Sequence, residues 1–341
     1  MGVCGDTAEV TPAGLGPAHT TGGWGAAVTN QILTPAVMEW AGRAAPGARV
    51  ARCAVRPLAG GAVARRVDQV TLHLTGHHEP LELVRKQAFA HEIAGLRAAQ
   101  AIRRQTTAIP ELVAWGSDWL ITPLAPGSPL AWGDAVPANL VDALAALHAR
   151  YHGAAGLPAV IPRVTPAWWQ ALCREWVDPR LGEYAARHPP ETIARARALV
   201  DQAAGHPAAS ALLAGLPPTL LHGDVHPGNV LVHADQATLI DWGSSRIGPA
   251  ALDLANLVAA GSADVARYAR TWQQLTGQPL TGDAIELGYR WAALQIPVQY
   301  LPWTIGHQPT RDVEAVLDQI EQALGQLRSL AVRDGSCRDR G

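Results

Sequence analysis

The sequence contains little lysine, phenylalanine or cysteine. Lys86 is the only lysine, so 26 of the 27 basic residues are arginine, and a single phenylalanine stands against 12 tryptophans. Tryptophan therefore fills positions that phenylalanine takes in other proteins, which predicts that most of the indole rings belong to the core. Composition does not explain why the single lysine is kept, because arginine is the basic residue everywhere else in the chain.

Other absences exclude whole classes of protein. The formal net charge of −2 carries no signature of nucleic-acid binding. No apolar run reaches the length of a transmembrane helix, and the first thirty residues lack the basic and apolar regions of a signal peptide, so we expect no membrane association. The four cysteines have no metal-ligand spacing. We expect them to be free thiols in a reducing compartment, and the protein to be cytoplasmic.

A segment in the second half of the chain, residues 220–255, contains most of the functional information. Asp224 is followed five residues later by Asn229 in a loop that includes proline and glycine. The apolar residues and turn residues over 230–240 predict a hairpin that returns Asp241 to the side of Asn229. Carboxylate and amide oxygens are the ligands that Mg²⁺ prefers, so Asn229 and Asp241 are the predicted metal ligands.

Asp224 is not needed for the metal, and we expect it to orient an acceptor hydroxyl and to accept its proton during phosphoryl transfer. This division of roles is that of the protein kinases, in which H-R-D-x-x-x-x-N precedes a metal-binding aspartate. The chain departs from their pattern at Gly223, which replaces the arginine, at His226, and at Trp242, which replaces the phenylalanine of D-F-G. These departures indicate a particular branch of kinases.

The motifs HGDVHPGN at 222–229, IDW at 240–242, GP at 248–249 and DLA at 253–255 closely resemble the aminoglycoside phosphotransferase and choline kinase-like family of small-molecule kinases. The resemblance implies an α+β class and a two-lobed protein-kinase-like fold, with a small antiparallel β-sheet in the N-lobe and a mainly helical C-lobe. It also implies ATP, or GTP, as phosphate donor, Mg²⁺ as cofactor, and direct in-line transfer without a phospho-enzyme.

Three further residues of the motifs are predicted to support the catalytic loop rather than to take part in the chemistry. His222, His226 and Asp253 have side chains that suit hydrogen bonds to loop backbone, and buried polar groups need such partners. The next glycine-proline pair begins only seven positions after Asp241, which leaves no room for a regulated activation segment. The short segment therefore favours a small molecule over a protein as the substrate.

A kinase also needs a cation for the nucleotide phosphates, and the first half of the chain offers two. Residues 81–86 read as a strand and are followed by a helix that contains Glu92. Arg85 and Lys86 lie on opposite faces of that strand, so the pattern alone leaves both open. Composition favours Lys86, because the mechanism requires a compact point charge. Glu92 is then expected to pair with Lys86, the alternative being a solvated carboxylate on the helix surface.

Two other strands of the first half are separated by a glycine pair at positions 60 and 61. Such a pair can bring backbone amides close to a phosphate or can simply turn a hairpin, and the sequence does not choose between them. Residues 119–124 are predicted to be the strand and hinge that join the lobes. There we expect the backbone near Thr122 and Leu124 to meet the adenine edge.

The chain is expected to fold as one two-lobed enzyme, because 341 residues with 48% apolar content can bury a large core. The predicted division is a flexible N-terminal tail at 1–30, an N-lobe with the nucleotide-binding sheet and helix at 31–125, a helical C-lobe with the catalytic loop and substrate site at 126–331, and a C-terminal tail at 332–341.

Substrate contacts are expected in the C-lobe, where residues 165–176 and 291–303 are rich in aromatic side chains. The shortage of phenylalanine favours a core role for these rings over a substrate cage. An aminocyclitol polycation would favour several convergent carboxylates. No dense acidic cluster is visible, which weakens an aminoglycoside assignment, although scattered acids can converge in space.

The sequence thus predicts an ATP- and Mg²⁺-dependent phosphotransferase that moves the γ-phosphate to a hydroxyl of a small molecule, either an aminoglycoside-like antibiotic or a hydroxylated metabolite. The alternatives are a kinase of a protein substrate and a non-catalytic nucleotide-binding regulator. The second is disfavoured because every catalytic position is filled. Fold analogy leaves the substrate and the oligomeric state open.

Overall fold

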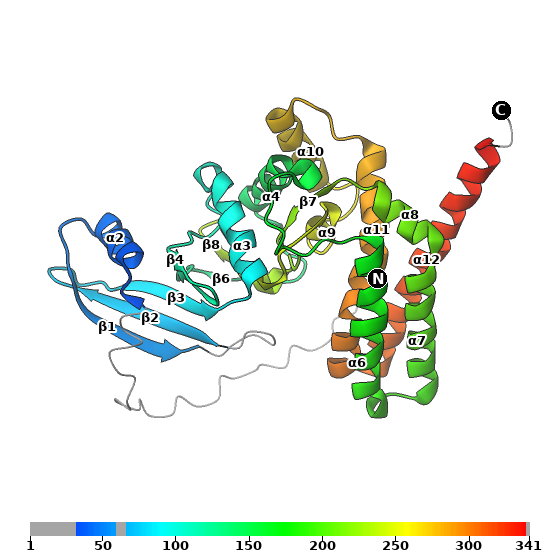
Figure 1. The fold of residues 1–341 in the computed structure, drawn as a ribbon, viewed down its shortest axis with the longest axis horizontal. Helices are drawn as coiled ribbons and strands as arrows, with labels where there is room; N and C mark the ends of the chain where they lie inside the picture. Colours follow the sequence, from blue (N-terminus) through cyan, green and yellow to red (C-terminus); the bar gives the residue numbers. More distant parts are fainter. Residues whose placement is uncertain (1–31, 59–65, 339–341) are drawn as a thin grey trace.

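The computed structural model describes the backbone of residues 32–58 and 66–338 and the side chains as far as residue 328. The predicted N-terminal tail at 1–30 and the glycine pair at 60 and 61 lie outside the described residues. Two lobes follow one another along the long axis of the molecule (Figure 1). The small lobe contains α2 (Pro35–Ala44), β1 (Val50–Pro57), β2 (Val67–Leu74), β3 (Leu81–Gln87), α3 (Ala90–Ala99), the 3₁₀ helix η1 (Gln100–Gln105), β4 (Ala114–Trp115) and β5 (Trp119–Pro123).

The sheet of the small lobe is antiparallel, with strand order β1-β2-β3-β5-β4. One face is covered by α2, whose Val37 and Trp40 belong to the same buried cluster as Leu72 of β2 (Figure 1). This helix starts after Thr34, whose hydroxyl accepts a hydrogen bond from the Val37 amide at 3.3 Å, and proline occupies its first turn. The apolar face of the sheet is thereby buried against a helix.

Helix α3 connects the sheet to the large lobe through a close approach to the chain that follows Asp241. A Cβ atom on Gly95 would lie 2.4 Å from the Ser245 side chain, so only glycine fits at this point. The ring of His91 adds a hydrogen bond to the Gly243 carbonyl at 2.9 Å. These contacts fix the distance between α3 and the catalytic segment.

The large lobe is mostly helical, which confirms the predicted α+β class and two-lobed fold. Its elements are β6 (Ser128–Pro129), α4 (Ala138–Arg150), η2 (His152–Ala154), α5 (Pro166–Ala171), the π-helix η3 (Leu172–Val177), α6 (Asp178–Glu183), η4 (Ala185–Arg187), α7 (Pro190–Gly205), α8 (Pro207–Gly215), β7 (Pro218–Leu221), η5 (Pro227–Asn229), β8 (Val230–His233), β9 (Gln236–Leu239), η6 (Trp242–Ser244), β10 (Arg246–Pro249), α9 (Ala251–Leu254), α10 (Ala263–Thr276), α11 (Gly282–His307) and α12 (Thr310–Arg338).

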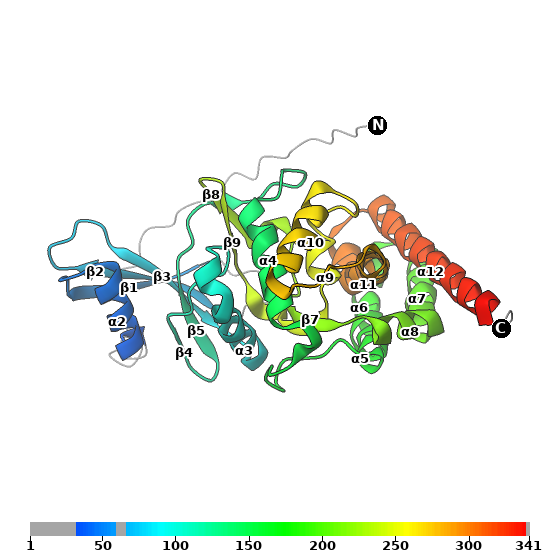
Figure 2. The ribbon, with the colours of Figure 1, turned by 90° about the horizontal axis from the view of Figure 1, so that it is seen from above.

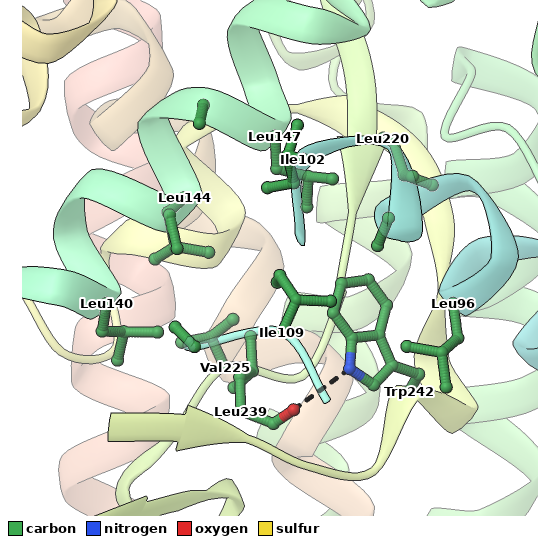
Figure 3. Packing of buried hydrophobic residues seen from close by; sticks show 14 of the residues in the cluster. Leu96, Ile102, Ile109, Leu140, Leu144, Leu147, Leu220, Val225, Leu239 and Trp242 are labelled. Carbon is green, nitrogen blue, oxygen red and sulfur yellow. Dashed lines mark hydrogen bonds between the residues drawn. The ribbon is translucent and has the colours of Figure 1, made fainter. Parts of the chain in front are cut away.

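Residues 220–255 pack mainly on a buried core to which both lobes contribute. Figure 3 shows leucines of α4 packing towards Val225, Leu239 and Trp242, and these residues belong to one buried cluster. The indole of Trp242 donates a hydrogen bond to the Leu239 carbonyl at 3.1 Å. The tryptophan that replaces phenylalanine after the predicted metal ligand is therefore a core residue that anchors the hairpin end.

The far part of the large lobe is a bundle in which α12 packs along α11 and α7 (Figures 1 and 2). The aromatic stretches noted in the sequence divide there into two kinds of residue. Trp169 and Trp291 are buried, with ring centroids 5.1 Å apart in an edge-to-face arrangement, whereas Trp176 and Trp303 are 40% and 50% exposed. The buried pair fits the core role favoured above.

The C-terminal boundary differs from the sequence prediction. Helix α12 continues to Arg338, so the backbone is helical over most of the stretch that we assigned to a C-terminal tail from residue 332. Among the described helices, none has the length and apolarity needed to cross a membrane.

Candidate active site

The predicted hairpin forms and brings the three motif residues together. Strands β8 and β9 pair in antiparallel fashion, with Val230 opposite Leu239. The Ile240 amide then donates to the Asn229 carbonyl at 2.9 Å, which places Asp241 directly after the rung that holds Asn229. Asp241 adopts the left-handed conformation, with φ of 58°. A residue other than glycine is uncommon there, and such conformations often mark functional sites.

Asp224 lies at the other end of the loop, and its two carboxylate oxygens have different surroundings. The Asn229 side-chain amide donates to the Asp224 backbone carbonyl at 2.9 Å and, more weakly, to Oδ2 at 3.3 Å. Oδ1 accepts a hydrogen bond from the hydroxyl of Tyr300 in α11. The His226 Nε2 atom is 3.8 Å from Oδ2. The sequence prediction missed Tyr300 entirely.

Lys86 joins the two lobes by binding two carboxylates. Its Nζ lies 2.7 Å from Glu92 Oε1 on α3 and 2.5 Å from Asp241 Oδ1 in the large lobe. Burial by itself would lower the pKa of Lys86, but the two carboxylates raise it above its ordinary value, so the ammonium stays charged. Burial would likewise raise the pKa of Asp241, yet Lys86 holds it below its ordinary range.

The structure separates the two basic residues of β3 that the sequence left in competition. Lys86 points into the space between the lobes, whereas the Arg85 guanidinium lies 3.6 Å from the buried Asp68 carboxylate and near the Trp119 ring. Glu92 is only 2% exposed, which contradicts the alternative of a solvated surface carboxylate. The predicted pair of Lys86 and Glu92 is therefore present.

These groups line one cleft between the lobes, with a volume of about 300 Å³. Its walls include Lys86 and Glu92 from the small lobe and Asp224 and Asp241 from the large lobe. Phe89, at the start of α3, forms part of the rim and is 42% exposed. Lys86, the predicted metal ligand Asp241 and the predicted base Asp224 thus line one solvent-accessible cleft.

His222 and Asp253 both form hydrogen bonds with the backbone of the loop that carries Asp224. The buried Asp253 carboxylate accepts hydrogen bonds from the amides of His222 and Gly223, each at 2.8 Å, and contacts His148 Nε2 at 3.3 Å. Burial alone would raise the pKa of Asp253, but the hydrogen bond and charge of His148 help to hold it below its ordinary value. The carboxylate is therefore ionised and fixes two consecutive loop amides.

The histidines of the motif serve the loop in two different ways. Burial lowers the pKa of His222 and favours the neutral ring. Its Nε2 atom lies 2.9 Å from the Ile240 carbonyl, and its Nδ1 atom accepts from the Asp224 amide at 3.3 Å, so one ring links the loop to the hairpin. His226 caps η5, where its Nδ1 accepts from the Gly228 amide at 3.1 Å.

Gly223 makes room for an arginine that comes from another strand. Its φ of 86° is left-handed, and an added Cβ would lie 2.1 Å from the Ser244 carbonyl oxygen and 2.9 Å from Arg246 Nε. The buried Arg246 of β10 donates to the Gly223 carbonyl and, at 2.8 Å, to Gln299 of α11. Arg246 and Gln299 were also missed, although a glycine where related kinases carry arginine indicates that another group fills the space.

The hinge prediction is more constrained than the sequence indicated. Thr122 lies within β5, paired with Val84, and the Leu124 amide already donates to the Glu82 carbonyl at 3.0 Å. The sheet therefore already uses the Leu124 amide, which is not free to meet an adenine edge.

The donor set fits a magnesium ion. The Asn229 amide nitrogen faces Asp224, and Asp241 Oδ1 is occupied by Lys86 and the Gly243 amide. Within the described part of the chain, no hydrogen bond is formed by the remaining oxygens, Asn229 Oδ1 and Asp241 Oδ2. Mg²⁺ takes one or two such hard oxygen ligands and completes its shell with phosphates and water.

Comparison with known proteins agrees with this geometry. Over residues 54–283 the sequence matches the phosphotransferase enzyme family, and the chain belongs to that family. The membership confirms the predicted enzyme class, a small-molecule kinase, that is, a phosphotransferase with an alcohol group as acceptor. No curated protein matches the sequence at a significant level.

Solved structures share the fold at low sequence identity. A choline kinase from Cryptosporidium parvum is 12% identical, with a TM-score of 0.52 over 83% of this chain and 91% of that one. A choline/ethanolamine kinase family protein from Mesorhizobium loti is 14% identical, with a TM-score of 0.50 over 89% and 98%. A macrolide 2′-phosphotransferase from Brachybacterium faecium is 20% identical, with a TM-score of 0.45 over 84% and 98%. At these identities the likeness to the first two structures is one of fold.

Proposed function

We propose that the protein transfers the γ-phosphate of ATP, with GTP as a possible donor, to a hydroxyl group of a small molecule in a Mg²⁺-dependent reaction. The observation that carries the proposal is the convergence of Lys86 of β3 with Asp224 and Asp241 of the distant 220–255 segment on one cleft. Phosphoryl transfer needs little covalent chemistry from the protein, so catalysis depends on where these charges lie.

In the proposed mechanism Asp224 accepts a hydrogen bond from the acceptor hydroxyl, aligns its oxygen with the γ-phosphorus and takes the proton as the new P–O bond forms. The bond from the γ-phosphorus to the β–γ bridging oxygen breaks at the same time, and the nucleoside diphosphate leaves with that oxygen. Lys86, held by Glu92, neutralises the nucleotide phosphates. Asn229 Oδ1 and Asp241 Oδ2 would hold Mg²⁺, which when bound neutralises charge on the β- and γ-phosphates. His222, His226 and Asp253 keep the loop in the shape that this alignment requires.

The chain between Asp241 and β10 supports a small molecule as the acceptor. It consists of the short η6 and Ser245, and Gly95 of α3 packs tightly against it. Arg246 then fixes the start of β10 to the catalytic loop without any phosphate group. A segment this short provides no long platform for a peptide, and no step of phosphorylation is needed to order it.

Substitution of the proposed base provides the direct test. Asp224→Asn should reduce turnover by roughly 10²–10⁴-fold, because general-base catalysis typically contributes that much. The assay is release of nucleoside diphosphate with labelled ATP or GTP, Mg²⁺ and a panel of amino alcohols, sugars, nucleosides, macrolides and aminoglycosides. Asp235→Asn, in the exposed turn of the same hairpin, is the matched control and should keep full activity.

The outcomes separate the possible functions. Full turnover by Asp224→Asn would refute the assignment of the base. A wild-type protein that binds Mg²⁺-nucleotide but phosphorylates no member of the panel, and no protein in an extract, would instead be a nucleotide-binding regulator. Labelling confined to extract proteins would identify a protein kinase.

A further inference from the structure

Asp224 has a neighbour that the family motifs do not contain. Tyr300 reaches the Asp224 carboxylate from α11, 76 residues further along the chain, and its hydroxyl donates a hydrogen bond to Oδ1. Burial, and then the Asp224 charge, raise the pKa of Tyr300 far above its ordinary value, so the phenol keeps its proton. A phenol that cannot ionise remains a hydrogen-bond donor throughout the working pH range.

The segment of α11 that carries Tyr300 lies between two prolines inside the helix, Pro297 and Pro302. Each proline removes one backbone donor and disturbs the regular helical bonding. The Thr304 hydroxyl donates to the Tyr300 carbonyl at 3.1 Å and stabilises this stretch. The position of the phenol therefore depends on a local helix geometry that prolines and side-chain bonds define together.

A second connection joins the same two pieces of chain. Gln299, next to Tyr300, accepts from Arg246 at 2.8 Å, and Arg246 donates to the carbonyl of Gly223, next to Asp224. Two consecutive residues of α11 thus hold two consecutive residues of the catalytic loop. Because the two bridges end on adjacent residues, they form a closed ring that resists both translation and rotation of the loop relative to α11.

The ring leaves one carboxylate oxygen open to an acceptor. Oδ1 is occupied by Tyr300, whereas Oδ2 has only a 3.3 Å contact with Asn229 and a 3.8 Å separation from His226. Each carboxylate oxygen can accept two hydrogen bonds, and Oδ2 lies on the side of the proposed metal ligand Asn229. An acceptor hydroxyl on Oδ2 would therefore meet the phosphate that the metal holds.

We propose that Tyr300 is a positioning residue for phosphoryl transfer: its hydroxyl stays on Asp224 Oδ1 during turnover, locks the carboxylate rotation, and directs Oδ2 to the acceptor hydroxyl. This proposal rests on the proposed function. It makes α11 part of the catalytic apparatus, because the helix sets the orientation of the base. The opposite arrangement, in which the phenol only occupies the acceptor's place and must leave, predicts the reverse kinetic effect.

The test compares Tyr300→Phe with Tyr289→Phe. Both residues lie on α11, and the Tyr289 hydroxyl donates at 2.9 Å to the Val258 carbonyl and not to Asp224. With an acceptor identified from the panel above, we expect Tyr300→Phe to lower kcat by about 10–100-fold, part of the factor that an oriented base supplies. The KM for the nucleotide and its affinity measured by calorimetry should change less than about twofold, because Lys86 and the metal ligands are untouched.

A purely structural role is separated by the control and by thermal unfolding. Tyr289→Phe should keep wild-type kcat even if its melting temperature falls as much as that of Tyr300→Phe. An unchanged kcat in Tyr300→Phe would overturn the proposal, and so would a raised kcat or a lowered KM for the acceptor, which would identify the phenol as an obstacle. Failure of the proposed function itself would show differently, as a wild-type protein without Mg²⁺-dependent transfer.

Discussion

Replacing Asp253 by asparagine should destabilise the protein far more than the same change at a surface carboxylate. Asp253 is fully buried and accepts hydrogen bonds from two consecutive amides, His222 and Gly223. Asparagine retains one acceptor oxygen and turns an NH₂ group towards the other amide, so one buried N–H loses its acceptor. An unsatisfied buried donor costs about 1–3 kcal/mol, and the lost charge weakens the remaining bond, for a total of about 2–4 kcal/mol.

Calorimetric or spectroscopic melting provides the assay. At about 2–4 °C per kcal/mol for a domain of this size, the melting temperature of Asp253→Asn should fall by roughly 5–15 °C. Asp142→Asn is the control. Asp142 also accepts several hydrogen bonds, from Arg267 and Thr271, but its side chain is 34% exposed, and a screened pair of this kind contributes less than about 1 kcal/mol.

The pH dependence gives a second check with a definite sign. Because the folded protein holds the pKa of Asp253 below its ordinary value, the carboxylate stabilises the fold at all pH values above the unfolded pKa, near 4. That contribution is lost as the pH falls through the lower folded pKa. The difference in melting temperature between wild type and Asp253→Asn should therefore be constant from pH 7 to 5 and shrink below about pH 4. Equal effects of Asp253→Asn and Asp142→Asn at pH 7 would refute the reasoning.

Two other substitutions test the close contacts of the site. Gly223→Ala should lower the free energy of unfolding in denaturant by about 2 kcal/mol or more and abolish turnover, because its Cβ would meet the Ser244 carbonyl. Gly277→Ala is the control: Gly277 is also left-handed, but an added Cβ would have nothing within 4 Å, so this variant should show the conformational cost alone. Equal losses of stability in the two variants would contradict the clash. Lys86→Arg should lower kcat/KM by about 10²-fold, because a planar guanidinium cannot replace the ammonium between its two carboxylates. Arg85→Lys, on the other face of the strand, is the control and should leave the kinetics with nucleotide unchanged. Comparable losses in the two variants would show that Lys86 has no special role.

Much of the site could be predicted because its geometry is local. A loop, a two-stranded hairpin and a fixed number of residues bring Asp224, Asn229 and Asp241 together whatever surrounds them. The alternation of a strand limited the cation to two candidates, and the composition chose Lys86, which the contacts with Glu92 and Asp241 now support.

The missed residues depend on packing between distant elements. Tyr300 reaches Asp224 only because α11 crosses beneath the catalytic loop, and nothing in the spacing of residues 291–303 distinguishes a core ring from one beside the base. Arg246 is one of 26 arginines in the chain, so its type carried no signal. For the hinge, the strand was predictable, but the use of the Leu124 amide by the sheet depends on the register between β3 and β5.

The single lysine allows the cleft between the lobes to be probed by proteolysis. A protease that cleaves only after lysine has a single target bond in the whole chain, and that bond follows a residue in β3 whose side chain is 13% exposed and bound to both lobes. Cleavage there requires local unfolding of the small-lobe sheet, so its rate measures how often the cleft between the lobes comes apart. Protection by a bound nucleotide would then appear as a change in the rate of one cut, without any label and before any acceptor is known.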